Sequence, residues 1–501
     1  MKFLKKYFPL LSILAVSAFY FFVHLRRDLL TDWDECIYAA YTHSMKLTGN
    51  FMVNQFNGQT VFDKPPLYMW MLSLSTAFGE NEFSFRVLSA IAGLGLLTAV
   101  YLFAHIYFSR KVAVLAALLL LTSQSIVSHA RIVNTDIFFT LFIFLAAWSW
   151  FESYKRNHFS YIAGVLLGLG VMVKGLGSLQ FLGVMLICAV FDMKRDSLGR
   201  FLKVLAGFLV VVLPWHLVAF ILHGSDFLNV YLYDNVIKRS LYAIENHRER
   251  WFFYFKLVSA EFFPWIVFLA VAPFSIFLRV NRVRSPQTFQ YAWAQSRVLF
   301  TVILLFILPL LSISRVMTKL SWYAMPILPF LAIIIAYYIT VFTKRLALSI
   351  MQGPVGSSLV NAVFIVIVLL ISIDAFTTLS KQARLINPQR EVSPRNAAIL
   401  QTKKYKDNDL DYLVPFGERQ GRAVLPETEQ IAQTWYYGGN ACAVYYSQKY
   451  VYYHYHPEEF VRKMNKEAGV YLVENGDLHF LKEIKNKKKV YENIEYTIFI
   501  R

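Results

Sequence analysis

The run VLSAIAGLGLLTAVYLFAHIYF, residues 87–108, contains no Lys, Arg, Asp or Glu. A helix that crosses a bilayer needs about 17–25 mostly apolar residues, and this run has that length. Ten further apolar runs lie at roughly 8–25, 112–128, 136–151, 159–173, 176–192, 201–222, 256–278, 298–314, 324–342 and 359–378. Composition agrees, because 57% of the 501 residues are hydrophobic, against about 45–50% in soluble domains. The sequence therefore predicts an α-helical polytopic membrane protein with about eleven transmembrane helices, and about 9–13 if runs merge or split.

The formal net charge of +18 is the second feature of the chain. The basic residues lie between the apolar runs, so membrane topology explains them and no nucleic-acid partner is predicted. A cytoplasmic N-terminus puts five basic loops inside the cell, while Arg26 and Arg27 depart from the rule. The five loops carry Arg110 and Lys111; Lys155 and Arg156; Lys194, Arg195, Arg200 and Lys203; Arg279, Arg282, Arg284 and Arg297; and Lys344 and Arg345. Loops 24–86 and 223–255 and the C-terminus are then expected on the outer face of the cell inner membrane.

The composition changes near residue 379. Two short apolar runs, 470–473 and 496–500, predict strands. Pro457, followed by two acidic residues, predicts the start of a helix. We therefore expect a transmembrane domain over 1–378 and an extracytoplasmic α/β domain over 379–501. The cysteines have no metal-binding spacing, and a bond between Cys36 and Cys442 stays open on condition that both lie outside.

Ionisable residues gather at the outer ends of the apolar runs. They are Asp34, Glu35, Asp63, Lys64, Arg86, Asp136, Lys174, Lys319 and, in the second outer loop, His247. Charges fixed close to lipid are costly and commonly mark a site. Each residue also has a structural explanation: Asp34 could cap a helix, Glu35 could complement a helix dipole, and Arg86 or Lys319 could anchor in the headgroups. The glycines around Lys174 favour close helix packing over phosphate binding.

Carboxylates and cations together at a membrane edge suit chemistry on a lipid phosphate. Lys and Arg stabilise the charge on a departing phosphate, most strongly where water is scarce. A carboxylate within reach of a hydroxyl can remove its proton as a general base. Sugar transfer from a polyprenyl phosphate requires both functions and no nucleotide.

Four motifs carry a resemblance to a known family. In chain order they are Asp34-Glu35 with Tyr38-Ala39, the turn Phe62-Asp63-Lys64-Pro65-Pro66-Leu67-Tyr68, the pair Thr135-Asp136, and Lys319-Leu320 with Tyr323, Pro326 and Pro329. Together with weaker matches to the same family between them, these motifs span roughly residues 30–330. The chain resembles the GT-C class of membrane glycosyltransferases, in the group that unites protein O-mannosyltransferases with bacterial lipid A aminoarabinose transferases.

The resemblance implies an inverting transfer from a polyprenyl-phosphate-linked sugar to a hydroxyl or phosphate of lipid A, another glycolipid, a surface glycan or a protein. It implies that Asp34 and Asp136 are catalytic. The donor phosphate would be held by Lys64, Arg86, Lys174, Lys319 and Tyr323. Substrate would be positioned by Glu35, Tyr38, Asp63 and His247.

Two departures from the group stand out: Ile37 lies where relatives often have a basic residue, and Asp63 lies where they usually have Glu. A divalent metal is implied by the resemblance alone, since the sequence has no His or Cys cluster, and no cofactor is otherwise predicted. The alternative function is a lipid or sugar transporter or flippase, which would have midplane sites and internal repeats. A polymerase or ligase of the O-antigen type would instead use a large outer loop as its main site.

Overall fold

The computed structural model describes residues 2–31, 33–191, 195–243, 247–270, 286–350, 354–383, 393–405, 408–415, 441–484 and 486–501. The chain divides into two compact units. We call Met1–Val23 with Val87–Pro388 the membrane unit, and His24–Arg86 with Gln389–Arg501 the loop unit. The predicted domains, 1–378 and 379–501, divide the chain along a different line and stay a prediction.

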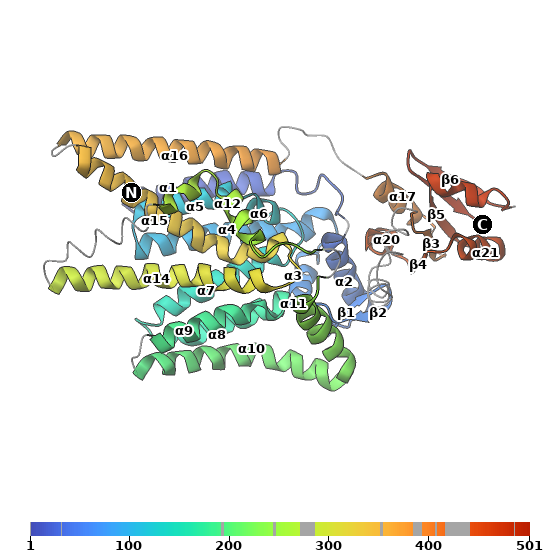
Figure 1. Ribbon diagram of the computed structural model, residues 1–501. Helices are drawn as coiled ribbons and strands as arrows, with labels where there is room; N and C mark the ends of the chain where they lie inside the picture. The colour runs from blue at the N-terminus through green and yellow to red at the C-terminus, as the bar shows by residue number, and fades with distance from the viewer. Residues whose placement is uncertain are drawn as a thin grey trace. The chain divides into compact units, whose positions relative to one another are not determined.

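The membrane unit is helical (Figure 1). Its elements are α1 (Lys2–Phe22), α4 (Glu82–Tyr107, whose first turn belongs to the loop unit), α5 (Arg110–Thr122), α6 (Gln124–His129), α7 (Asp136–Glu152), α8 (Phe159–Lys174), η1 (Leu176–Ser178), α9 (Leu179–Phe191), α10 (Arg195–Phe227), the π-helix η2 (Leu228–Lys238), α11 (Arg239–Leu241), α12 (Phe253–Glu261), η3 (Trp265–Ala270), α14 (Pro286–Arg315), η4 (Ser321–Ile327), α15 (Leu328–Ile350) and α16 (Pro354–Gln382).

Five helical stretches among the described residues are long and apolar enough to cross a membrane. They are Glu82–Tyr107, Asp196–Leu241, Arg297–Arg315, Ser321–Arg345 and Ser358–Gln382, and three shorter apolar helices accompany them. The predicted helical, membrane-spanning class is confirmed. Eleven crossings stay a prediction, and part of the predicted run 256–278 lies outside the described residues.

Glycines let the helices of the membrane unit approach closely. A Cβ atom on Gly164 of α8 would lie 1.9 Å from the Val204 carbonyl oxygen of α10, and one on Gly168 would lie 2.8 Å from Val211 Cβ. In Figure 1, α8 and α10 run side by side, and α7 packs against α8 as well. Small residues permit this kind of backbone approach. The packing role predicted for the glycines before Lys174 is confirmed at Gly168.

The loop unit combines a hairpin, helices and a sheet. Its elements are α2 (Asp34–Thr48), β1 (Asn54–Phe56), β2 (Gln59–Val61), α3 (Leu67–Ser75), α17 (Pro394–Thr402), β3 (Leu410–Leu413), α20 (Ala441–Ser447), β4 (Val451–His454), α21 (Pro457–Lys466), β5 (Val470–Glu474), η5 (Asn475–Leu481), β6 (Lys488–Glu492) and β7 (Tyr496–Ile500). The strand order is β4-β3-β5-β7-β6, with β3 parallel to β4 and β5 and the other pairs antiparallel.

The sheet of the loop unit packs one face against α21. The core there contains Leu413, Phe460, Met464, Tyr471 and Phe499, all buried. Strand β5 and strand β7 lie where the two short apolar runs predicted strands, and α21 begins at Pro457. The predicted C-terminal α/β character is therefore confirmed. The loop unit also contains the disulfide that the sequence left open, between Cys36 and Cys442.

Candidate active site

Glu35 and Arg86 form a buried ion pair in the loop unit. Arg86 donates from Nε to Glu35 Oε1 and from Nη2 to Glu35 Oε2, each at 2.7 Å. The rest of the guanidinium donates to the backbone carbonyls of Leu25, Asp28 and Leu29. Glu35 Oε2 also accepts from the Thr31 amide at 2.8 Å. These bonds join Leu25, Asp28, Leu29 and Glu35 to one guanidinium. The role of Arg86 as a donor-phosphate ligand stays a prediction.

Asp34 is the first residue of α2, and its position differs from that of a helix cap. Trp33 occupies the N-cap position with φ 65°, and its side chain makes no capping hydrogen bond. The Asp34 side chain is half-buried, whereas the neighbouring Glu35 is buried. The capping role left open for Asp34 is therefore wrong, and a catalytic role stays a prediction.

Lys64 lies against Tyr38 of α2, the helix that begins at Asp34. Its Nζ donates to the Tyr38 hydroxyl at 2.5 Å and lies 4.7 Å from the centre of the Tyr38 ring. Tyr38 follows Asp34 by four residues, so the two side chains share one helix face about 5–6 Å apart at Cβ. Asp63 lies 3.8 Å from Lys64 Nζ, and Asn54 donates to the Lys64 carbonyl at 2.8 Å. The loop unit thus gathers Asp34, Tyr38 and Lys64, three of the predicted site residues.

A second cluster of predicted site residues lies in the membrane unit. Lys174, at the end of α8, forms an ion pair with Asp136, at the start of α7. Asn134 Oδ1 accepts from the Asp136 amide at 2.9 Å, which fixes the first turn of α7. Lys174 Nζ also lies 5.5 Å from the centre of the Tyr323 ring. The cation is therefore held between a buried carboxylate and an aromatic ring.

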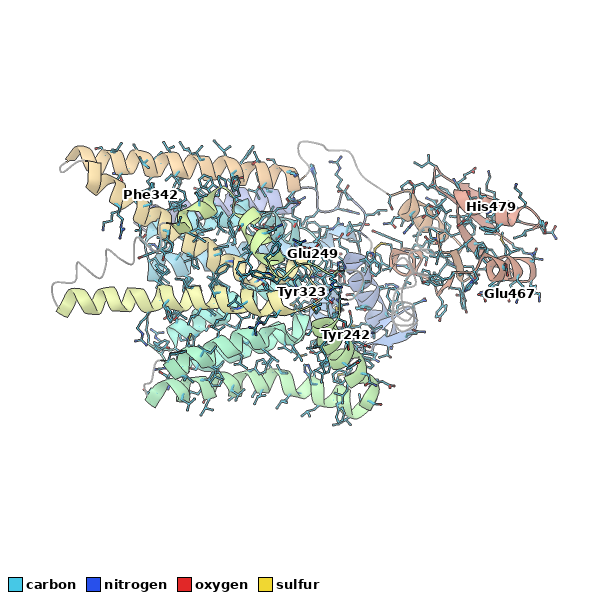
Figure 2. The ribbon with its side chains drawn as sticks, viewed as in Figure 1. Tyr242, Glu249, Tyr323, Phe342, Glu467 and His479 are labelled. Carbon is cyan, nitrogen blue, oxygen red and sulfur yellow. A yellow bond between two sulfur atoms is a disulfide. The ribbon has the colours of Figure 1, made fainter. Side chains whose placement is uncertain are left out.

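Lys319 and His247 meet through their backbones. The Lys319 amide donates to the His247 carbonyl at 3.0 Å, and the Thr318 hydroxyl donates to the Tyr242 carbonyl at 2.7 Å. Figure 2 labels Tyr242, Glu249 and Tyr323 in this region of the membrane unit. Lys319 Nζ donates to the Val316 carbonyl at 2.5 Å and is mostly buried. Burial lowers the pKa of Lys319, although the charge of Glu249 opposes the shift.

The described residues provide no group of three or more His, Cys, Asp or Glu side chains that could hold a metal ion. Asp63, the acid near which the resemblance places a metal, lies beside Lys64 instead.

Glu261 is a polar residue that the sequence analysis missed. Its carboxylate accepts from the Ser123 and Ser125 hydroxyls at 2.6 and 2.5 Å, and from the Ser125 amide at 3.2 Å. It thereby ties α12 to the start of α6 inside the membrane unit. Its position within an apolar run gave no indication of these distant partners.

This chain is similar to a known protein family and to several solved structures. The family described as dolichyl-phosphate-mannose-protein mannosyltransferase matches residues 63–220. The chain is similar over 98% of its length to the structure of ArnT from Cupriavidus metallidurans bound to undecaprenyl phosphate, with TM-score 0.70, 15% identity and 97% of that chain covered. The resemblance to the GT-C transferases is confirmed. An archaeal oligosaccharyltransferase from Archaeoglobus fulgidus is similar with TM-score 0.57 and 12% identity, over 100% of this chain and 75% of its own.

Curated relatives extend the comparison with the GT-C group. An undecaprenyl phosphate-alpha-4-amino-4-deoxy-L-arabinose arabinosyl transferase of Pseudomonas fluorescens is 30% identical over 64% of this chain and 54% of its own length. Its counterpart in Pseudomonas aeruginosa is 28% identical over 70% of this chain and 62% of its own length. The match thus covers little more than half the length of these relatives.

Proposed function

We propose that this chain is a glycosyltransferase, moving a sugar with inversion from a polyprenyl-phosphate-linked donor to a hydroxyl or phosphate acceptor. One similar structure holds undecaprenyl phosphate, and several relatives are named as arabinosyl transferases of an undecaprenyl phosphate sugar. The observation that carries the proposal is the bond from Lys64 to Tyr38, one helical turn beyond Asp34. It places a cation against the side chain that lies one helical turn beyond the half-buried Asp34 carboxylate.

With a hydroxyl acceptor, the reaction is a single displacement. The Asp34 carboxylate takes the hydroxyl proton as the acceptor oxygen forms its bond to C1 of the sugar. The bond from C1 to the phosphate oxygen breaks, and its electron pair stays on the departing polyprenyl phosphate. The Lys64 ammonium stabilises that charge, more strongly where water is excluded.

The remaining predicted residues receive narrower roles in this proposal. Lys174 is a second candidate cation, which Asp136 orients from the start of α7. Tyr323 lies beside that cation and is a candidate contact for the donor. Glu35 and Arg86 satisfy each other and the backbone before α2, so we assign them to positioning Asp34.

Hydroxyl and phosphate acceptors can be distinguished, because only a hydroxyl must lose a proton when it attacks. A phosphate acceptor is ionised at neutral pH and attacks without losing a proton, so Asp34 would only orient it. A hydroxyl acceptor requires the base, and its loss costs roughly 10²–10⁴-fold in rate. Asp34→Asn therefore separates a hydroxyl of a glycolipid, glycan or protein from a phosphate such as that of lipid A.

The outer face of the cell inner membrane is the location that we propose for the loop unit. The disulfide between Cys36 and Cys442 supports it, because such bonds persist in oxidising compartments and are rare in the cytosol. The distribution of basic residues between the apolar runs supports the same orientation.

The test uses the full chain, purified in detergent or lipid, with a panel of polyprenyl-phosphate sugars and membrane extract. Mass spectrometry scores released polyprenyl phosphate and the glycosylated product. Lys64→Ala should lose transfer to either acceptor, and Asp34→Asn should lose transfer to a hydroxyl. Glu458→Gln and Lys466→Ala, exposed on α21, should retain transfer. Folded protein that moves a lipid-linked sugar across vesicles without forming a new glycosidic bond would establish the transporter alternative instead.

A further inference from the structure

The C-terminal part of the loop unit contacts the segment that carries Asp34 and Lys64 at three places. Helix α20 packs against α2, as Figure 1 shows. The hairpin formed by β1 and β2 contacts the start of β4. Each contact lies within a few residues of a side chain to which the proposed function assigns a role.

The first contact holds the backbone just before α2. The Leu30 amide donates to the Tyr446 hydroxyl at 2.6 Å, and the Leu30 carbonyl accepts from Asn396 Nδ2 at 3.3 Å. Tyr446 donates its own proton to Glu82 Oε1 at 3.2 Å. Burial first, and then the charge of Glu82, raise the pKa of Tyr446, so its hydroxyl stays protonated. Both polar backbone groups of a buried residue are thus satisfied by C-terminal side chains.

The second contact is covalent. Cys36, in the first turn of α2, is bonded to Cys442 of α20 across 406 residues of sequence. Cys442 and Tyr446 are four residues apart, so they lie on one face of α20. The same face therefore holds α2 by a disulfide and the residues before α2 by a hydrogen bond. Asp34 lies between these two points of attachment.

The third contact holds the hairpin before Lys64. Asn57, at the hairpin turn, donates from Nδ2 to the Val451 carbonyl at 2.9 Å and accepts at Oδ1 from the Val451 amide at 2.9 Å. The side-chain amide of Asn57 thereby makes the pair of hydrogen bonds to the edge strand β4 that the backbone of a neighbouring strand would make. At the other end of β1, Asn54 donates to the Lys64 carbonyl.

We propose that the C-terminal part of the loop unit positions both halves of the candidate site, with Tyr446 and the disulfide holding Asp34, and Asn57 holding the hairpin before Lys64. This inference rests on the proposed function. Loosening the start of α2 displaces the base, so it lowers kcat and leaves the donor KM nearly unchanged. Loosening the hairpin displaces the Lys64 ammonium, which both holds the donor phosphate and stabilises its departing charge, so it raises the donor KM and lowers kcat together. A purely structural brace would produce no such division.

The test compares Tyr446→Phe, Asn57→Ala and the double variant Cys36→Ser/Cys442→Ser in full-length protein. Tyr446→Phe keeps the ring and removes both hydrogen bonds of the hydroxyl, the one from the Leu30 amide and the one to Glu82, so kcat should fall at least roughly fivefold. The neighbouring Tyr445→Phe and the remaining cysteine variant, Cys188→Ser, are the matched controls and should keep wild-type kinetics. Dithiothreitol should lower the kcat of wild type and of Cys188→Ser to that of the double variant.

Hydrogen exchange measured by mass spectrometry gives a readout that needs no turnover. Amides of residues 30–36 should lose protection in Tyr446→Phe and in the reduced protein, whereas those of α21 should not change. Unchanged exchange and unchanged kcat in both would overturn the inference. A wild type that protects residues 30–36 but transfers no sugar would contradict the proposed function while the structural attachment stands.

Discussion

The ion pair of Glu35 and Arg86 is the residue-scale feature with the clearest energetic consequence. The two side chains are 1% and 6% exposed, and removing one partner leaves the other charge buried. Breaking such a pair costs about 3–5 kcal/mol. Glu35→Gln should therefore lower the melting temperature strongly, whereas Glu492→Gln, in an exposed pair with Lys489, should change stability by under about 1 kcal/mol.

The same pair separates two roles for Arg86. As a positioning residue, Arg86 acts on stability and kcat through the backbone before α2. As a donor-phosphate ligand, it would act on the donor KM. A normal melting temperature with a raised donor KM in Arg86→Lys would restore the role that the resemblance implied.

Lys319 gives a prediction for the dependence of activity on pH. Its folded pKa is lowered from the ordinary 10.5, mainly by burial, so the ammonium is fully present at lower pH and is lost as the pH rises through that lowered value. Donor binding by Lys319 should therefore weaken at a lower pH than for an exposed lysine. Arg stays charged, with a pKa above about 12. In Lys319→Arg the pH at which the donor KM begins to rise should therefore be higher than in wild type. If the donor KM of Lys319→Arg rises at the same pH as that of wild type, a group other than Lys319 is responsible for the rise.

Particular residues show how far the sequence could predict the candidate site. Asp34 and Lys64 share one loop, and the structure links them through Tyr38, which lies one helical turn beyond Asp34 and accepts a hydrogen bond from Lys64. Tyr446 and Glu261 were missed because their partners are 416 and 136–138 residues away. Contacts at such separations leave no periodic pattern in a single sequence.

At the scale of elements, the crossing of α8 and α10 yields a stability prediction. A methyl group at Gly164 would overlap the Val204 carbonyl oxygen, which is backbone and cannot rotate away. Gly164→Ala should force the helices apart and cost roughly 1–3 kcal/mol. Gly199→Ala, on α10 with open space around it, should gain up to about 1 kcal/mol from helix propensity. Equal melting temperatures for the two variants would contradict the close crossing.

The elements themselves were predictable where one physical signal dominated. Long apolar runs predicted α4, α10 and α16, because a helix must satisfy its own backbone within lipid. Proline and acids predicted the start of α21. The division of the run 112–128 into α5 and α6 was not predicted. The second helix begins there because the Ser123 hydroxyl caps α6 by accepting a hydrogen bond from the Ile126 amide. Such a cap inside an apolar run resembles an ordinary buried serine.

At the scale of the whole molecule, two independent features support the orientation that we propose. A disulfide in the loop unit favours an oxidising compartment for it, and the positions of the basic residues in the sequence favour a cytoplasmic side for the loops that carry them. Alkaline phosphatase, which must be exported to be active, should therefore be active when fused after Arg501 and inactive when fused after Arg156, between α7 and α8. A cytoplasmic fluorescent protein at the same sites should give the reverse pattern. Activity after Arg156 with none after Arg501 would put Cys36 and Cys442 in a reducing compartment, where their bond and its hold on α2 could not persist.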